Sequence, residues 1–160
     1  MAVPTKALAS VARSINAQIP RGQRRLHLSA EGEKRRREIL HVIVSLMVSA
    51  TVYQAAYDRR SDDQPVRDRC LEVLIGDALT RPVLAVVVDS RGPARDRRDR
   101  LTIARALAGS GRPTYEHRGS RDEPLLALPD AVGWAEGAGR DWRRIVRTIT
   151  EVRTVVGQRG

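Results

Sequence analysis

The sequence predicts an α/β fold, with helices packed on a sheet that is at least partly parallel. Apolar residues recur at helical spacing in several segments, and short segments with strand periodicity lie between them. Helical and strand-like segments alternate along the chain, which is typical of helices that connect the strands of a sheet. A length of 160 residues suits one domain, so we expect residues 1–160 to form a single α/β domain.

Helical periodicity predicts six helices. They cover residues 4–19, 31–46, 62–79, 95–109, 125–139 and 140–160. In the fourth of these, apolar spacing places Leu101, Ala104, Leu107 and Ala108 on the core face. The last is expected to be a C-terminal amphipathic helix, with Trp142, Ile145 and Val146 on its apolar side.

Four short segments are expected to be strands. They cover residues 25–29, 47–57, 83–89 and 113–118. The run "VLAVVVD" at 83–89 is continuously apolar and rich in β-branched residues until it ends at Asp89. Such a run is typical of a central strand that is covered on both faces.

The charge of the chain indicates a polyanionic partner. The formal net charge is +10, and only Lys6 and Lys34 among the 29 basic residues are lysines. Because the planar guanidinium binds phosphate through paired hydrogen bonds, nucleic acid is the expected partner. The alternative is that the arginine content reflects a GC-rich coding sequence and that the arginine stripes are solvated helix faces.

Composition excludes several classes of site and protein. Cys70 is the single cysteine, which excludes an internal disulfide and a cysteine-based zinc cluster and fits a reducing cytoplasm. Aromatic residues make up 3% of the chain and phenylalanine is absent, which disfavours base stacking. Polar residues interrupt the apolar stretch 39–56, so we expect no membrane span and a cytoplasmic location.

Carboxylates are the candidate catalytic groups, because the sequence contains no Walker loop, nucleophile elbow or zinc-protease motif. Asp89 ends a predicted strand, and sites in α/β sheets form at the carboxyl ends of strands. Asp58 and Glu116 occupy similar places, and Asp130 could point inward from a helix. Clustered carboxylates hold Mg²⁺ or Mn²⁺, which can support phosphodiester cleavage.

Each candidate also has a simpler interpretation. Asp89 precedes Ser90 and Gly92, as in an ordinary turn, and Asp130 could cap its helix. His27, His41 and His117 have no mutual ligand spacing. Trp134 and Trp142 are expected to be core or interface anchors.

Three motifs in order carry a family resemblance: "LHLSAEGEKRRREIL", "VLAVVVDSRG" and "YEHRGSRDEPLLALPDAVGWA". Over 25–139 the chain resembles the ribonuclease-H-like domain of unknown function 3800 family. The resemblance implies a ribonuclease-H-like mixed sheet flanked by helices, with Asp89 and Asp130 as catalytic and metal-binding acids. The chain differs from the family pattern at Arg25, where family members often have Glu, and at Leu126 or Leu128, where Gln is usual.

The family's opening strand with an Asp-Glu-Ser-Gly motif is not found before Pro4, and "MAVP" resembles the tail of a second strand. The expected fold is therefore N-terminally incomplete, without the first acid of the site. We expect a metal-dependent nuclease-like domain that uses Mg²⁺ or Mn²⁺ and is inactive if this acid is essential. The arginines expected to contact nucleic acid are Arg91, Arg95 and Arg98.

The alternative function is a non-catalytic nucleic-acid-binding or protein-interaction module. The missing strands would leave an exposed sheet edge, through which a homodimer could form.

Overall fold

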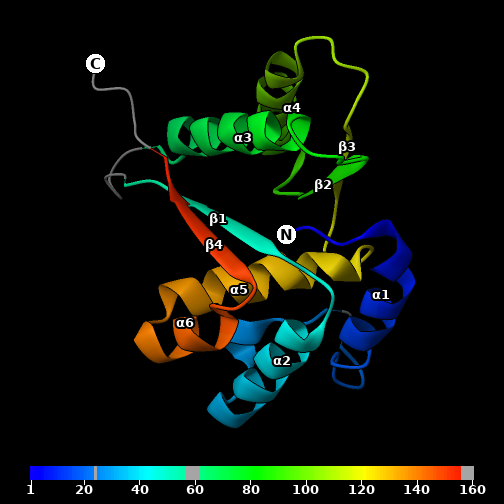
Figure 1. Cartoon of the computed structure of the whole chain (residues 1–160), viewed down its shortest axis with the longest axis vertical. Helices are drawn as coiled ribbons and strands as arrows, with labels where there is room; N and C mark the ends of the chain where they lie inside the picture. The colour runs from blue at the N-terminus through cyan, green and yellow to red at the C-terminus, as the bar shows by residue number, and fades with distance from the viewer. Residues whose placement is uncertain (24, 57–61, 156–160) are drawn as a thin grey trace. The chain divides into compact units, whose positions relative to one another are not determined.

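The computed structural model describes residues 1–23, 25–56 and 62–155 (Figure 1). The α-helices are α1 (Leu8–Asn16), α2 (Glu33–Ser45), α3 (Gln64–Leu79), α4 (Pro93–Leu107), α5 (Ala127–Gly137) and α6 (Arg140–Val146). The strands are β1 (Ala50–Gln54), β2 (Ala85–Asp89), β3 (Thr114–Arg118) and β4 (Thr150–Thr154). Short 3-10 turns, η1 (Thr5–Ala7), η2 (Leu28–Ala30) and η3 (Pro124–Leu126), precede α1, α2 and α5. Within these residues no helix has the length and apolar character needed to cross a membrane.

The chain divides into two compact units. Unit 1 comprises Met1–Val52 and Gly119–Glu151, and unit 2 comprises Tyr53–Arg118 and Val152–Gly160. The sequence indicates one domain and marks no boundary inside it. The α/β class is confirmed, because helices and short parallel strands alternate in the structure.

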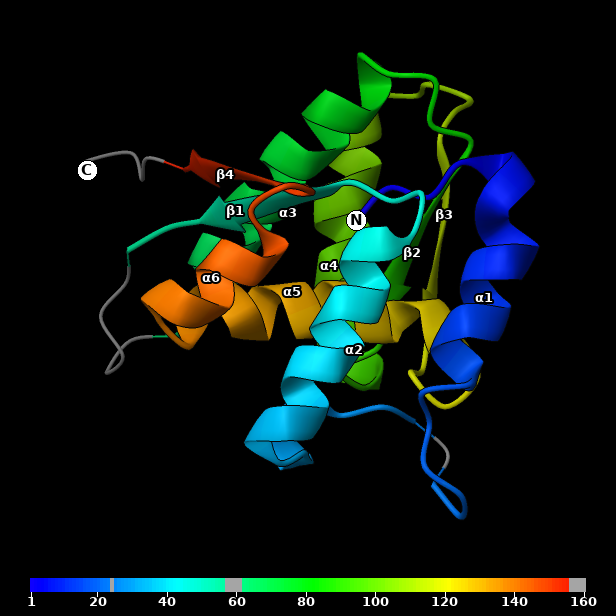
Figure 2. The same cartoon turned by 60° about the horizontal axis from the view of Figure 1, so that its bottom comes forward.

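Unit 1 is built around α5, against which α2 and α6 both pack (Figure 2). The apolar stripe of each helix points into one core, as helical periodicity requires. The core members with no exposed side-chain surface include Ile15 of α1, Ile39, Leu40 and Ile43 of α2, and Leu128 and Ala135 of α5.

Unit 2 contains a β–α–β crossover in which α4 connects the parallel strands β2 and β3. The register pairs Ala85 with Thr114 and Asp89 with Arg118, so both strands end at the same edge. Alternate residues of the strands pack on a second core formed by α3 and α4, whose buried members are Leu71, Ile75, Ile103 and Leu107.

The prediction that 83–89 is a central strand covered on both faces is wrong. In the described part of the chain β2 pairs only with β3, and Val86, Val87 and Val88 are half-buried. Val86 and Val88 contact the helices, whereas Val87 alternates to the other face of the sheet. The apolar run therefore reflects β-propensity more than complete burial.

The prediction of one helix over 140–160 is also wrong. Helix α6 ends at Val146, and β4 pairs with β1 in a second two-stranded sheet. The N–H of Ala50 donates to the carbonyl of Ile149 at 2.7 Å, and the N–H of Val155 donates to the carbonyl of Gln54 at 2.8 Å. The β-branched residues Thr150, Val152 and Thr154 suit a strand, and the backbone groups of β1 need a partner. The boundary between the units falls inside both strands of this sheet.

Two further predictions are corrected. Residues 25–29 do not form a strand, because Leu28–Ala30 is a 3-10 turn that leads toward α2. On α4 the core face is displaced from the expected one: Leu101 is 60% exposed, and Ala104 and Ala108 are exposed, while Asp96 and Asp99 are buried. Partners for both acids, described below, explain this displacement.

The N-terminal residues "MAVP" contribute one bridge to unit 1. Ala2 forms an isolated antiparallel bridge with Ser49, in which the two residues exchange hydrogen bonds of 2.7 and 3.1 Å.

Candidate functional site

Asp89 lies at the carboxyl end of β2, as the sequence predicts. The residue is exposed, and its carboxylate has no hydrogen-bond or ion-pair partner among the described residues. The N–H of the following Ser90 donates to the carbonyl of Arg118 at 2.9 Å, which holds the loop against the end of β3. Asp89 is therefore an unpaired carboxylate at the edge where both parallel strands end.

A buried acid, Asp96, holds the loop after Asp89 in place. Its carboxylate accepts hydrogen bonds from the Ser90 hydroxyl at 2.6 Å and from the Arg91 N–H at 2.8 Å, and the residue is 5% exposed. Burial alone would raise the pKa of Asp96, but these two bonds and the charge of the nearby Arg100 lower it overall. Gly92 then enters α4 with φ of +96°, a conformation that favours glycine.

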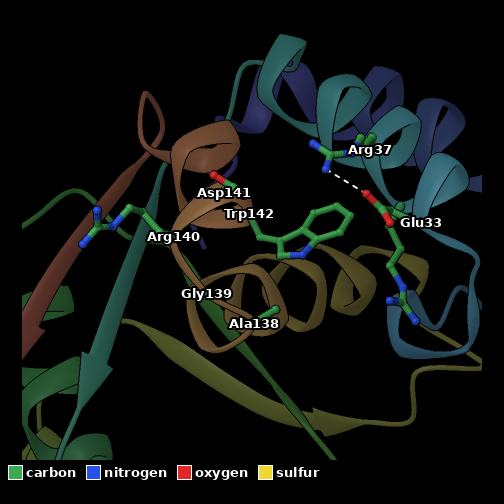
Figure 3. A pocket seen from close by; sticks show the side chains of 8 residues that line it. Glu33, Arg37, Ala138, Gly139, Arg140, Asp141 and Trp142 are labelled. Atoms are coloured by element: carbon green, nitrogen blue, oxygen red, sulfur yellow. Dashed lines mark hydrogen bonds and ion pairs between the residues drawn. The ribbon is translucent and has the colours of Figure 1, made fainter.

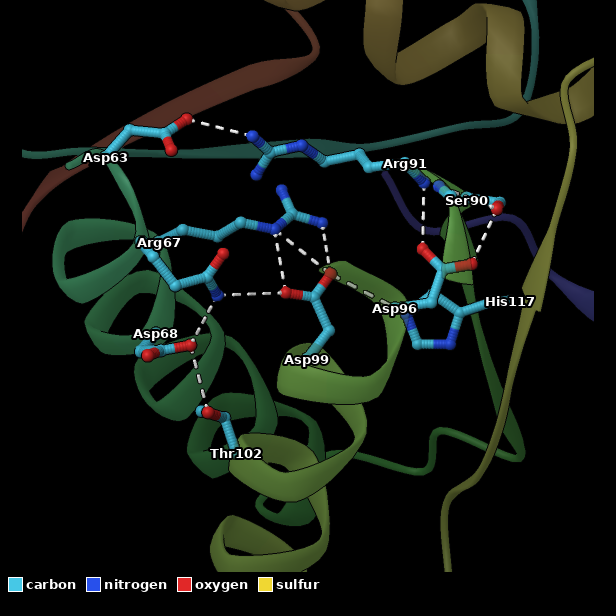
Figure 4. Close-up of polar contacts among 11 residues, drawn as sticks. Asp63, Arg67, Asp68, Ser90, Arg91, Asp96, Asp99, Thr102 and His117 are labelled. Carbon is cyan, nitrogen blue, oxygen red and sulfur yellow. Dashed lines mark hydrogen bonds and ion pairs between the residues drawn. The ribbon is translucent and has the colours of Figure 1, made fainter. Parts of the chain in front are cut away.

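A second acid of α4, Asp99, is fully buried against α3 (Figure 4). The Arg67 guanidinium donates to it through Nε at 3.0 Å and Nη2 at 2.6 Å, and the Gln64 amide lies at 3.4 Å. Burial would raise the pKa of Asp99, but the bonds from Arg67 outweigh that effect, so the pKa is lowered. The ion pair stabilises the packing of α3 on α4.

His117 of β3 lies beside this ion pair (Figure 4). Its side chain is 2% exposed, and neither ring nitrogen has a hydrogen-bond partner among the residues that the structure describes. The Nε2 atom lies 3.6 Å from Oδ2 of Asp99, just beyond hydrogen-bond distance. His117 is thus a buried polar group of unit 2.

The first two turns of α4 separate their charges. In the sequence "RDRRDR" at 95–100, both acids are buried, as described above, and all four arginines are exposed. We call these four residues the α4 arginine surface: Arg95, Arg97, Arg98 and Arg100.

Within the α4 arginine surface, the side chains of Arg95, Arg97 and Arg100 have no hydrogen-bond or ion-pair partner among residues 1–23, 25–56 and 62–155. Arg98 lies 3.5 Å from Asp62, and both side chains are 62% exposed. Exposed pairs of this kind are weak, so Arg98 can exchange its partner. Arg91 differs, because its guanidinium donates to Asp63 at 2.9 Å and is 22% exposed. A phosphate bound to Arg91 would compete with Asp63.

Asp130 belongs to unit 1, on the first turn of α5. It is exposed rather than pointing inward, and no capping hydrogen bond from its side chain to the helix is present. Its Oδ2 lies 3.5 Å from Nδ1 of His27, in the segment before η2. No signal in the sequence indicates this pair, because the two residues are 103 positions apart and neither belongs to a motif that predicts the contact.

The described residues do not assemble a metal centre. They contain no group of three or more His, Cys, Asp or Glu side chains that could hold an ion, although Mg²⁺ requires several oxygen ligands. Asp89 and Asp130 lie in different units, so their shared site stays a prediction. Glu116 is paired with Arg118 at 2.8 Å, and Asp58 lies outside the described residues. We therefore derive no hydrolytic step through a metal ion.

A cavity of about 330 Å³ in unit 1 is lined by α2 and the α5–α6 turn (Figure 3). Two of the three arginines that line it are engaged within the protein: Arg37 donates to Glu33 at 2.9 Å and lies 4.8 Å from the centroid of the Trp142 ring, and Arg36 lies 4.8 Å from that of Trp134. The Arg140 side chain points away from Trp142 (Figure 3). Trp142 also packs edge-to-face on Trp134 at 5.0 Å, as expected of an anchor. The cavity therefore offers an anion less free charge than the α4 arginine surface.

Comparisons with protein-family models, curated proteins and solved structures found no match for this chain.

Proposed function

We propose that this protein binds nucleic acid without catalysis and that the α4 arginine surface contacts backbone phosphates. The observation that carries the proposal is the separation of charge within "RDRRDR". Asp96 and Asp99 are buried and hydrogen-bonded within the protein, so neither carboxylate is exposed beside the arginines. Four guanidinium groups thus face solvent on two turns of one helix.

This arrangement suits phosphate for two reasons. Guanidinium groups form paired, charge-assisted hydrogen bonds with phosphate oxygens. The side chains of Arg95, Arg97 and Arg100 need not leave a partner within the described protein in order to bind. Binding through four such contacts would release counterions, so affinity is expected to fall with salt at a logarithmic slope of about −3.6.

The test is the affinity of the full chain for labelled nucleic acid in chelator at several salt concentrations. We expect Arg95→Gln, Arg97→Gln and Arg100→Gln together to weaken binding and to make the slope shallower by about 2.7. The matched control replaces Lys6, Arg13 and Arg21 with Gln. These residues are exposed and have no partner in the described part of unit 1, and their replacement removes the same charge as the triple substitution on α4. Equal losses in both variants, or no salt dependence, would remove the α4 arginine surface from the proposal.

A second candidate function, metal-dependent phosphodiester hydrolysis, rests on Asp89. Its exposed carboxylate, unpaired among the described residues, ends a parallel strand and lies four residues before Pro93, the first residue of α4. The test is hydrolysis of labelled DNA and RNA with Mg²⁺ or Mn²⁺ by the chain, by Asp89→Asn and by Asp130→Asn. If both substitutions abolish hydrolysis, the result supports a metal-dependent site that uses both acids. If Asp89→Asn still hydrolyses the substrate, Asp89 is not part of that site.

A further inference from the structure

We infer that the nucleic acid bound at the α4 arginine surface is double-stranded. The inference rests on the proposed function and adds the substrate class. Two independent observations support it: the spacing of the four arginines, and the engagement of the aromatic rings within the protein.

A duplex offers these arginines more phosphate charge per unit length than a single strand does. Residues 95–100 span about 7.5 Å of helix axis, since each residue advances the helix by about 1.5 Å. Duplex DNA carries one phosphate charge per ~1.7 Å of axis, whereas one strand of it carries one per ~3.4 Å. Over this length of axis a duplex presents about four phosphate charges and a single strand about two, so a duplex offers the arginines more phosphates to bind.

Proteins that bind single strands compensate for this lower density by stacking bases on aromatic side chains. None of the four aromatic residues in the described ranges is exposed: Tyr53, Tyr115, Trp134 and Trp142. The guanidinium groups of Arg36 and Arg37 lie over the two tryptophan rings, each 4.8 Å from the ring centroid.

The two tyrosines are engaged as well. The Tyr53 hydroxyl donates to Asp77 at 2.6 Å, and the Tyr115 ring packs edge-to-face on His117. Each described aromatic side chain therefore already makes a contact within the protein, and none is fully exposed to a base.

The α4 arginine surface has an apolar neighbour, Leu101, which is 60% exposed. Leu101 follows Arg97 by four residues and Arg98 by three, so it lies beside both on the helix. An aliphatic side chain can touch a sugar but gives no π-face for a base. This position is therefore suitable for adding the stacking group that the surface lacks.

The experiment compares matched duplexes and single strands of the same sequence, as DNA and as RNA, with the full chain in chelator. We expect the duplex to bind on the order of tenfold more tightly than its strands at moderate salt. Leu101→Trp is expected to raise single-strand affinity severalfold while changing duplex affinity little, because stacking adds mainly to unpaired bases. The matched control is Leu101→Gln, which removes the apolar side chain without adding a ring.

Each outcome has one meaning. Preference for either duplex, lost in the Arg95, Arg97 and Arg100 variant, supports the inference, and the DNA and RNA arms show which duplex is bound. Equal or tighter binding of single strands that still depends on these arginines overturns the inference and leaves the proposed function standing. No binding to any nucleic acid, or equal binding to polyglutamate, overturns both, and the latter result would indicate an acidic protein as the partner.

Discussion

Arg67 of α3 holds the fully buried Asp99 of α4 with hydrogen bonds of 2.6 and 3.0 Å. The same contact has two consequences. It joins the two helices that cover the β2–β3 sheet, and it removes an acid from the surface on which four arginines are exposed. Stability and surface charge in unit 2 therefore depend on one ion pair.

Arg67→Ala is expected to destabilise the protein by about 3 kcal/mol, because it leaves Asp99 as a buried charge without its main partner. Chemical denaturation measures the loss. The control is Arg98→Ala, which breaks an exposed pair with Asp62 and is expected to cost at most about 0.5 kcal/mol. Similar losses in the two variants would show that burial does not govern the Arg67–Asp99 pair.

Stability is expected to fall in acid, because folding lowers the pKa values of Asp96 and Asp99. Such groups stabilise the folded state fully above the pKa of an unfolded aspartate, about 3.9, and this contribution is lost as the pH falls toward the folded values. We expect Asp96→Asn to be less stable than the wild type at neutral pH and the difference to shrink below about pH 4. Unfolding free energies of the wild type and Asp96→Asn, measured from neutral pH to below about pH 4, test this prediction. A stability difference between the two that does not change with pH would contradict it.

Gly92→Ala is expected to cost about 1–3 kcal/mol, because φ of +96° with ψ of 161° is a conformation that is essentially restricted to glycine. An added Cβ meets no atom within 4 Å, so the cost is conformational. Gly76→Ala is the matched control, since Gly76 lies inside α3 with equally open space. That variant should gain about 0.5–1 kcal/mol in unfolding free energy. Thermal melts of both variants distinguish the destabilisation expected for Gly92→Ala from the stabilisation expected for Gly76→Ala. A stabilised Gly92→Ala would show that the loop does not require glycine.

Tyr53→Phe is expected to cost about 1.5–3 kcal/mol, because the hydroxyl donates a 2.6 Å hydrogen bond to the Asp77 carboxylate. Burial and this bond also raise the pKa of Tyr53 to about 12. Tyr115→Phe is the control, because its hydroxyl makes only a 3.5 Å contact with the carbonyl of Arg100. Denaturation of both variants should give the larger loss for Tyr53, and the reverse order would contradict the assignment.

Most helices were predictable because their signals are local. Pro65 near the start of α3 and Gly109 after α4 mark helix ends, and the apolar spacing around Ile39 and Ile43 marks the buried face of α2. The position of Asp89 at the end of β2 follows from the same kind of reasoning. These features depend on residues within a few positions of one another.

The errors occurred where distant residues decided the outcome. Apolar spacing alone predicts Leu101 in the core of α4, but Asp99 is buried instead because Arg67, 32 residues earlier, satisfies its charge. The sequence around β4 also permits a helix, and pairing with β1, about 100 residues earlier in the chain, makes it a strand. His27 and Asp130 meet only in the folded chain.

The sequence by itself determined the α/β class, the order of most elements, the excess of arginine and the place of Asp89 at a strand end. Only the tertiary structure decided which charges remain at the surface. A charged side chain is buried when partners compensate for its lost hydration; for Asp99 the main partner comes from another helix, and for Asp96 the partners come from the loop before α4. The composition of "RDRRDR" therefore could not show that its acids face inward while its arginines face solvent.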